Sequence, residues 1–95
     1  MKIESFRHKG LRRLYEDDDI RGLPPRMVGK IRNMLAALEA AATLEQVATF
    51  LGWRLHPLKG DRRGDYAMVV SRNMQLTFRV DGASLHDLDF EDYHE

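Results

Sequence analysis

The sequence contains no cysteine, three prolines and one tryptophan among its 95 residues. The absence of cysteine excludes a disulfide scaffold and any metal site with thiolate ligands. No apolar run approaches the roughly 18 residues that a membrane-spanning helix needs. The first ten residues, MKIESFRHKG, lack the apolar core of a secretory signal. We therefore expect a cytoplasmic protein, not a membrane protein, that folds as a single domain over residues 1–95.

A net charge of one sign is also absent, because 15 basic side chains balance 15 acidic ones. The two signs are nevertheless segregated along the chain. Residues 53–80 carry six basic and two acidic side chains, whereas residues 81–95 carry six acidic side chains and no Lys or Arg. The basic block is a candidate surface for a polyanion such as RNA. The alternative is the ordinary solvated face of a small domain.

The first half of the chain carries helical patterns. Residues 8–17 predict a weak amphipathic helix, although Gly10 disfavours it. The proline pair at 24–25 suits the start of a clearer helix. In that helix the apolar residues keep helical spacing; they are Met27, Val28, Ile31, Met34, Leu35 and Leu38.

The pattern changes near the middle of the chain. Thr43 and Gln46 fit a capping box that opens a short helix to about Leu51. Residues 53–58 then form an extended run whose proline indicates the edge of a sheet. Residues 59–65 form a basic, turn-rich loop.

The last third of the chain predicts strands. Residues 66–71 are rich in β-branched side chains, residues 81–84 read as a hairpin turn, and residues 85–90 read as a final strand. Between them one strand alternates strictly, with Met74, Leu76, Phe78 and Val80 on one face and Asn73, Gln75, Thr77 and Arg79 on the other. With a short opening strand near Ile3, this order predicts an α+β fold. Two or three helices pack on one face of a mainly antiparallel sheet, and the other face is polar and basic.

The four histidines each have an ordinary structural interpretation. His8 reads as a solvated surface residue, and His86 is a weak metal candidate because no two histidines share a zinc-binding spacing. His56 by itself reads as packing or surface, and His94 as part of a frayed tail. Two histidines beside Lys59 and several arginines would, however, suffice for metal-free RNA cleavage. One group takes the proton of the ribose 2′-OH, another protonates the leaving oxygen, and cations stabilise the phosphorane.

Three segments together carry a family resemblance: SFRHKGLRRLY at 5–15, GWRLHPLKGDRRG at 52–64 and DFEDYHE at 89–95. The chain resembles the HigB-type toxins of the RelE/ParE superfamily, from bacterial type II toxin–antitoxin modules. The resemblance covers nearly the whole chain. It implies a RelE-like fold and a ribosome-dependent endoribonuclease that cuts mRNA in the ribosomal A site and so inhibits translation. It also implies no metal and no organic cofactor.

The resemblance implies roles for five catalytic residues. His94 would act at the 2′-OH or at the leaving group, and Asp92 would orient it or support proton transfer. Lys59 would bind the scissile phosphate, and His56 would assist at the phosphate or base. Tyr93 would stack on a nucleobase. The division of acid and base roles between the two histidines stays open.

One position departs from the family pattern. The strand after the basic loop usually carries an arginine where this chain has Gln75. Glutamine can hydrogen-bond a phosphate but brings no charge. Other cations that can bind RNA phosphates nearby in sequence are Arg62, Arg63, Arg72 and Arg79.

The resemblance also implies partners. These are mRNA, the 70S ribosome through its A-site rRNA, and a cognate helix-turn-helix antitoxin of the HigA kind. One alternative is a toxin of the same fold with a non-nuclease target, gyrase; another is a catalytically weak RNA- or ribosome-binding module. In a third, purely structural reading the HPLKG segment is a strand exit and the tail has no function.

Overall fold

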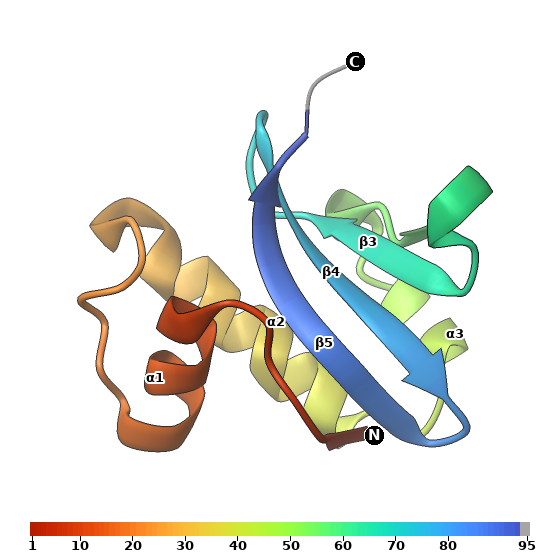
Figure 1. Cartoon of the computed structure of the whole chain (residues 1–95), viewed down its shortest axis with the longest axis horizontal. Coiled ribbons are helices and arrows are strands. Elements are labelled where there is room, and N and C mark those ends of the chain that lie inside the picture. The colour runs from red at the N-terminus through yellow and green to blue at the C-terminus, as the bar shows by residue number, and fades with distance from the viewer. Residues whose placement is uncertain (94–95) are drawn as a thin grey trace.

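A computed structural model describes residues 1–93 of the chain. The short strand comes first, the helices follow, and an antiparallel meander ends the chain (Figure 1). The α-helices are α1 (Lys9–Asp17), α2 (Val28–Ala40) and α3 (Leu44–Ala48). The strands are β1 (Lys2–Ile3), β2 (His56–Pro57), β3 (Asp65–Val69), β4 (Met74–Asp81) and β5 (Ser84–Asp92). Three short 3₁₀ turns connect them, η1 (Pro25–Met27), η2 (Leu51–Trp53) and η3 (Gly60–Arg62).

The strands form one mixed sheet in the order β1-β5-β4-β3-β2. β1 runs parallel to β5, and the other neighbours are antiparallel. In Figure 1, α2 runs behind the sheet and α1 lies to the left of it. The predicted α+β architecture, with helices on one face of a mainly antiparallel sheet, is confirmed. Within the described residues, none of the helices has the length and apolar character needed to span a bilayer.

The core forms between α2 and the inner face of the sheet. Ile31, Met34 and Leu38 have no exposed surface, as their spacing on one side of α2 predicts. They belong to one cluster with Leu76 and Phe78 of β4, which alternate onto the helical face. Helical spacing and strand alternation therefore predicted both sides of this core.

His8 is not the solvated surface residue that the sequence suggested. It is the N-cap of α1, where its Nδ1 accepts hydrogen bonds from the backbone N–H groups of Gly10 and Leu11 at 3.0 and 3.3 Å. Its ring also meets the Phe90 ring edge-on, with centroids 5.7 Å apart. The prediction was wrong because a side-chain acceptor ahead of a helix satisfies N–H groups that the first turn leaves open.

The third helix is shorter than predicted and is capped differently. α3 ends at Ala48 and η2 follows, so the extended run expected over 53–58 shrinks to the two residues of β2. The Thr43 side chain makes no capping hydrogen bond. Instead, the Gln46 Oε1 accepts the backbone N–H of Ala42 at 2.8 Å, which replaces the predicted capping box.

Two glycines let the loop after α1 pack closely on that helix. A Cβ added at Gly10 would lie 2.8 Å from the Gly22 carbonyl carbon and closer still to its oxygen. A Cβ added at Gly22 would lie 2.6 Å from the Gly10 Cα. Gly10 therefore lowers helix propensity but permits a contact that a side chain would exclude.

A β-bulge shapes β5. Thr77 of β4 pairs with Asp89, whereas Arg79 pairs with His86, so β5 has one extra residue between these two pairs. Within this bulge Asp87 adopts a left-handed conformation with φ 56°. The extra residue explains why Leu85 and Leu88, three positions apart, are both completely buried.

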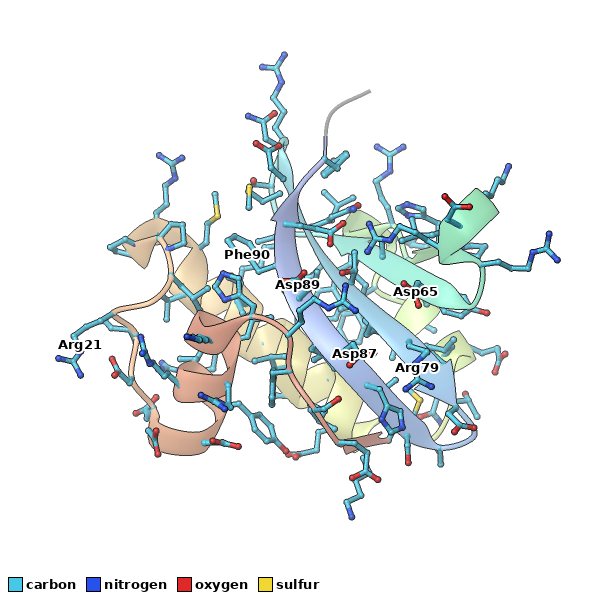
Figure 2. All side chains as sticks on the ribbon, viewed as in Figure 1. Arg21, Asp65, Arg79, Asp87, Asp89 and Phe90 are labelled. Atoms are coloured by element: carbon cyan, nitrogen blue, oxygen red, sulfur yellow. The ribbon has the colours of Figure 1, made fainter. Side chains whose placement is uncertain are left out.

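The face of the sheet opposite the helices, here called the open face, is polar as predicted but is not simply basic. Figure 2 shows Asp65, Arg79, Asp87 and Asp89 on the side turned away from α2. The Arg79 Nε lies 3.6 Å from the Asp87 Oδ2. The expectation of a basic face was wrong because alternation along β5 brings acidic residues of the tail onto the same face.

Candidate active site

A hollow of about 950 Å³ gathers residues from three distant parts of the chain, and we call it the His56 hollow. It is lined by Arg54, Leu55, His56, Val69, Arg72, Asn73 and Tyr93. Three of the residues proposed from the sequence, His56, Arg72 and Tyr93, thus share one site. The lining residues among positions 1–93 include two arginines and no carboxylate. Such a hollow suits an anion such as a phosphodiester.

His56 lies on the edge strand β2, where it pairs with Ala67 of β3. Its Nδ1 is 2.7 Å from the carbonyl oxygen of Arg54. A carbonyl only accepts hydrogen bonds, so Nδ1 carries the proton. Nε2 is then the ring nitrogen that makes no bond to this carbonyl. Arg54 is in the left-handed region with φ 51°, at the end of η2.

Tyr93 continues the line of β5 beyond its last residue. Its backbone N–H donates to the carbonyl oxygen of Asn73 at 2.9 Å, beside the connection between β3 and β4. The phenol ring is half-buried and lies in the wall of the His56 hollow. Arg72, in the same connection, is exposed.

Asp92 lies in a different hollow. That hollow has a volume of about 380 Å³, and its lining includes Arg26, Met27, Arg72 and Asp92. The strand period explains the separation, because Asp92 pairs with Met74 of β4, whose side chain packs against the helical core. Consecutive residues of β5 and its extension alternate between faces, so Asp92 is directed away from Tyr93. His94, the fifth catalytic residue expected, lies outside the described residues.

The basic loop carries further cations, outside the lining of the His56 hollow. Lys59 and Arg63 flank η3 and are exposed, and neither lines the His56 hollow. Arg62 is directed across the open face to Glu91 of β5. Its Nη1 and Nη2 lie 2.5 and 3.1 Å from the two carboxylate oxygens, and its Nε lies 3.8 Å from Asp65.

Gln75 of β4 contacts this ion pair through Glu91. It is 5% exposed, and its Nε2 donates to the Glu91 carboxylate at 3.2 Å. Thr77, 2% exposed, donates its hydroxyl to the same carboxylate at 3.2 Å. Burial raises the pKa of Glu91, but the hydrogen bond and charge of Arg62, with the bonds from Gln75 and Thr77, outweigh it and lower the pKa below the ordinary 4.5.

Sequence reasoning did not single out Arg54, Asn73 or Glu91 as site residues. Arg54 belongs to the basic block, and it immediately precedes the LHPLKG segment. Strand alternation could have indicated Glu91, since it places Glu91 on the same face as Tyr93 and Asp92 on the other face.

The arrangement of helices and sheet is that of the RelE/YoeB-like toxins. A YoeB/ParE toxin from Agrobacterium tumefaciens superposes with a TM-score of 0.61 at 20% identity, over 99% of this chain and 100% of that one. YafQ from E. coli gives a TM-score of 0.57 at 14% identity, over 96% of this chain and 91% of that one. These likenesses establish the fold.

The family follows from the sequence. Residues 4–94 match the model of the HigB-like toxins, described as the RelE-like toxin of type II toxin–antitoxin system HigB. Endoribonuclease HigB of Proteus vulgaris is 37% identical over 92 residues, covering 97% of this chain and 99% of that protein. The chain belongs to the HigB-like toxins of type II toxin–antitoxin systems and is a homologue of an endoribonuclease. Membership in such a system implies a cognate antitoxin as partner.

Proposed function

We propose that this toxin cuts mRNA in the ribosomal A site by attack of a ribose 2′-OH on the adjacent phosphate. The observation that carries the proposal is the His56 hollow, which combines an imidazole of fixed tautomer, two arginines and an aromatic ring. RNA itself supplies the nucleophile in such a reaction. The protein has to supply a base, an acid and cations that stabilise the transition state.

The proposed reaction balances without any further reactant. A base removes the proton of the 2′-OH, O2′ bonds to phosphorus, the bond from phosphorus to O5′ breaks, and an acid protonates O5′. The products are a 2′,3′-cyclic phosphate and a 5′-hydroxyl. We assign His94 to one proton transfer, with Asp92 supporting it and His56 assisting. Lys59 binds the scissile phosphate and Tyr93 stacks on a base.

The proposed partners follow from the same reading. Exposed cations of the basic loop (Lys59 and Arg63) and of the hollow itself (Arg72) suit salt-dependent contacts with mRNA and with the rRNA of the A site. We propose a small helix-turn-helix protein of the HigA kind as the antitoxin.

Primer extension on a defined mRNA in a purified translation system tests this function. Wild type and His94→Ala are compared with and without ribosomes. We expect cuts inside codons that require ribosomes and disappear in the variant. His86→Ala is the matched control, because His86 lies on β5 in register with Arg79, outside the lining of the hollow, and should cut normally.

Two results would contradict the proposal. Growth arrest in cells without any mRNA cuts would point to another target, such as gyrase. Toxicity that survives in His94→Ala would point to a module that binds RNA or the ribosome without turnover.

A further inference from the structure

One ion pair physically connects the two segments that carry the expected catalytic residues. Arg62 and Glu91 are 29 positions apart and meet across β3 and β4 through two parallel hydrogen bonds. Lys59 lies three residues before Arg62, and Tyr93 lies two residues after Glu91. The pair therefore joins the basic loop to the C-terminal segment.

The pair is built into the fold more firmly than an ordinary surface ion pair. The Glu91 side chain is 24% exposed and the Arg62 side chain 40% exposed. The Glu91 carboxylate accepts four hydrogen bonds, two of them from Arg62 and one each from Gln75 and Thr77. Because Gln75 and Thr77 are buried in β4, their hydrogen bonds fix the position of the carboxylate that binds the Arg62 guanidinium.

The Arg62 side chain attaches the basic loop to the sheet. Gly60 and Gly64 bound its central residues with φ values of 67° and 99°, and neither has a neighbour that a Cβ would meet. Within residues 1–93, Arg62 is the member of the 59–64 loop whose side chain forms ion pairs or hydrogen bonds with the sheet. Without it, the loop would be tied at its base by the backbone bond from Leu58 to Asp65.

We propose that Arg62 and Glu91 are a positioning pair, which holds the basic loop so that Lys59 acts on the same phosphate as the residues of the C-terminal segment. The proposal rests on the proposed function, since RNA cleavage is its readout. It assigns Arg62 a different role from the phosphate contact expected from the sequence, because both of its Nη atoms are engaged by Glu91.

Glu91→Gln separates the two roles. If Arg62 binds phosphate directly, removing the carboxylate charge frees its guanidinium, and cleavage is unchanged or faster. If the pair positions the loop, Glu91→Gln weakens the attachment while the amide keeps the size of the side chain. We then expect the single-turnover rate on ribosome-bound mRNA to fall about tenfold or more, since small misplacements of catalytic groups have effects of this order. KM should change little.

Two further variants complete the experiment. The double variant Arg62→Gln, Glu91→Gln should cut no more slowly than the slower single variant, because both substitutions remove the same interaction. The exchanged pair, Arg62→Glu with Glu91→Arg, should recover part of the rate. Arg21→Gln is the control, because Arg21 forms an exposed ion pair with Asp19 away from the hollow.

Amide hydrogen exchange of residues 59–64 supplies a readout independent of cleavage, and we expect it to accelerate in Glu91→Gln. Two results would overturn the positioning role, provided that the wild type cuts mRNA. One is a Glu91→Gln variant that cuts as fast as the wild type or faster. The other is a double variant whose rate loss equals the product of the two single losses. A wild type that does not cut mRNA at all would instead contradict the proposed function.

Discussion

The imidazole of His56 is oriented by the backbone carbonyl of Arg54, whose oxygen lies 2.7 Å from Nδ1. Arg54 holds this carbonyl in place from a left-handed conformation at the end of η2. The hydrogen bond commits one ring nitrogen to a structural role and leaves Nε2 for chemistry. In the proposed reaction this geometry makes His56 an acid or base beside the phosphate.

Replacing His56 tests that role. We expect His56→Ala to slow single-turnover cleavage by about 10²–10⁴, the usual effect of losing general acid–base catalysis. His56→Asn should be nearly as slow, because its amide can still donate to the Arg54 carbonyl but cannot transfer a proton. Since His56 is exposed, neither variant should change the melting temperature appreciably. A fully active His56→Asn would show that the ring only orders the backbone.

Arg72 should act through charge. It lines both the His56 hollow and the hollow that contains Arg26. We expect Arg72→Ala to weaken binding to ribosomes carrying mRNA and to reduce the slope of log affinity against log salt by about one. Binding measured over a salt series checks this. Arg21→Ala, on the loop between α1 and α2 (Figure 2), should leave the slope unchanged; an equal reduction in both variants would contradict a local role for Arg72.

Glu91 should make stability depend on pH. Its pKa is lower in the folded protein than its ordinary 4.5, so the unfolded state binds the proton more readily. The stabilisation is therefore complete above about pH 4.5, the unfolded pKa, and is lost as the pH falls through the folded pKa. Thermal unfolding of wild type and Glu91→Gln should differ by a constant amount between pH 6 and 8, and the difference should shrink in acid. A difference that grows in acid would contradict this account.

The contact between Gly10 and Gly22 should be sensitive to one methyl group. We expect Gly10→Ala to destabilise the fold by about 1–3 kcal/mol, the usual cost of overpacking, although alanine is the better helix former. Gly29→Ala in α2 is the matched control, because a Cβ there meets nothing within 4 Å. It should be neutral or stabilising by about 0.5–1 kcal/mol. Urea denaturation of the two variants measures both effects, and equal stability changes would contradict the close packing.

Periodic patterns predicted the elements whose neighbours are set by local rules. Apolar spacing located α2, and strict alternation located β4 and its inner face. The family resemblance implied catalytic roles for His56 and Tyr93, and the fold brings these two residues to one hollow, while their roles stay predictions. The elements were predictable because their residues keep a regular spacing along the chain.

One outcome that the sequence did not predict involves side chains far apart in the chain. Gln75 and Thr77 are buried beneath Glu91 of another strand, which also binds Arg62 of the basic loop. Such a cluster requires three-dimensional neighbours that no local pattern encodes. The error at His8 was local, because its Nδ1 accepts from backbone N–H groups only two and three residues further along the chain.

The chemical ends of the cut mRNA test the central claim most directly. Wild-type toxin would be incubated with programmed ribosomes, and the fragments on both sides of the cut would be analysed by mass spectrometry. Attack by the 2′-OH predicts a 2′,3′-cyclic phosphate on the upstream fragment and a 5′-hydroxyl on the downstream fragment. A 3′-hydroxyl with a 5′-phosphate would show that water attacked instead, and would contradict the proposed mechanism.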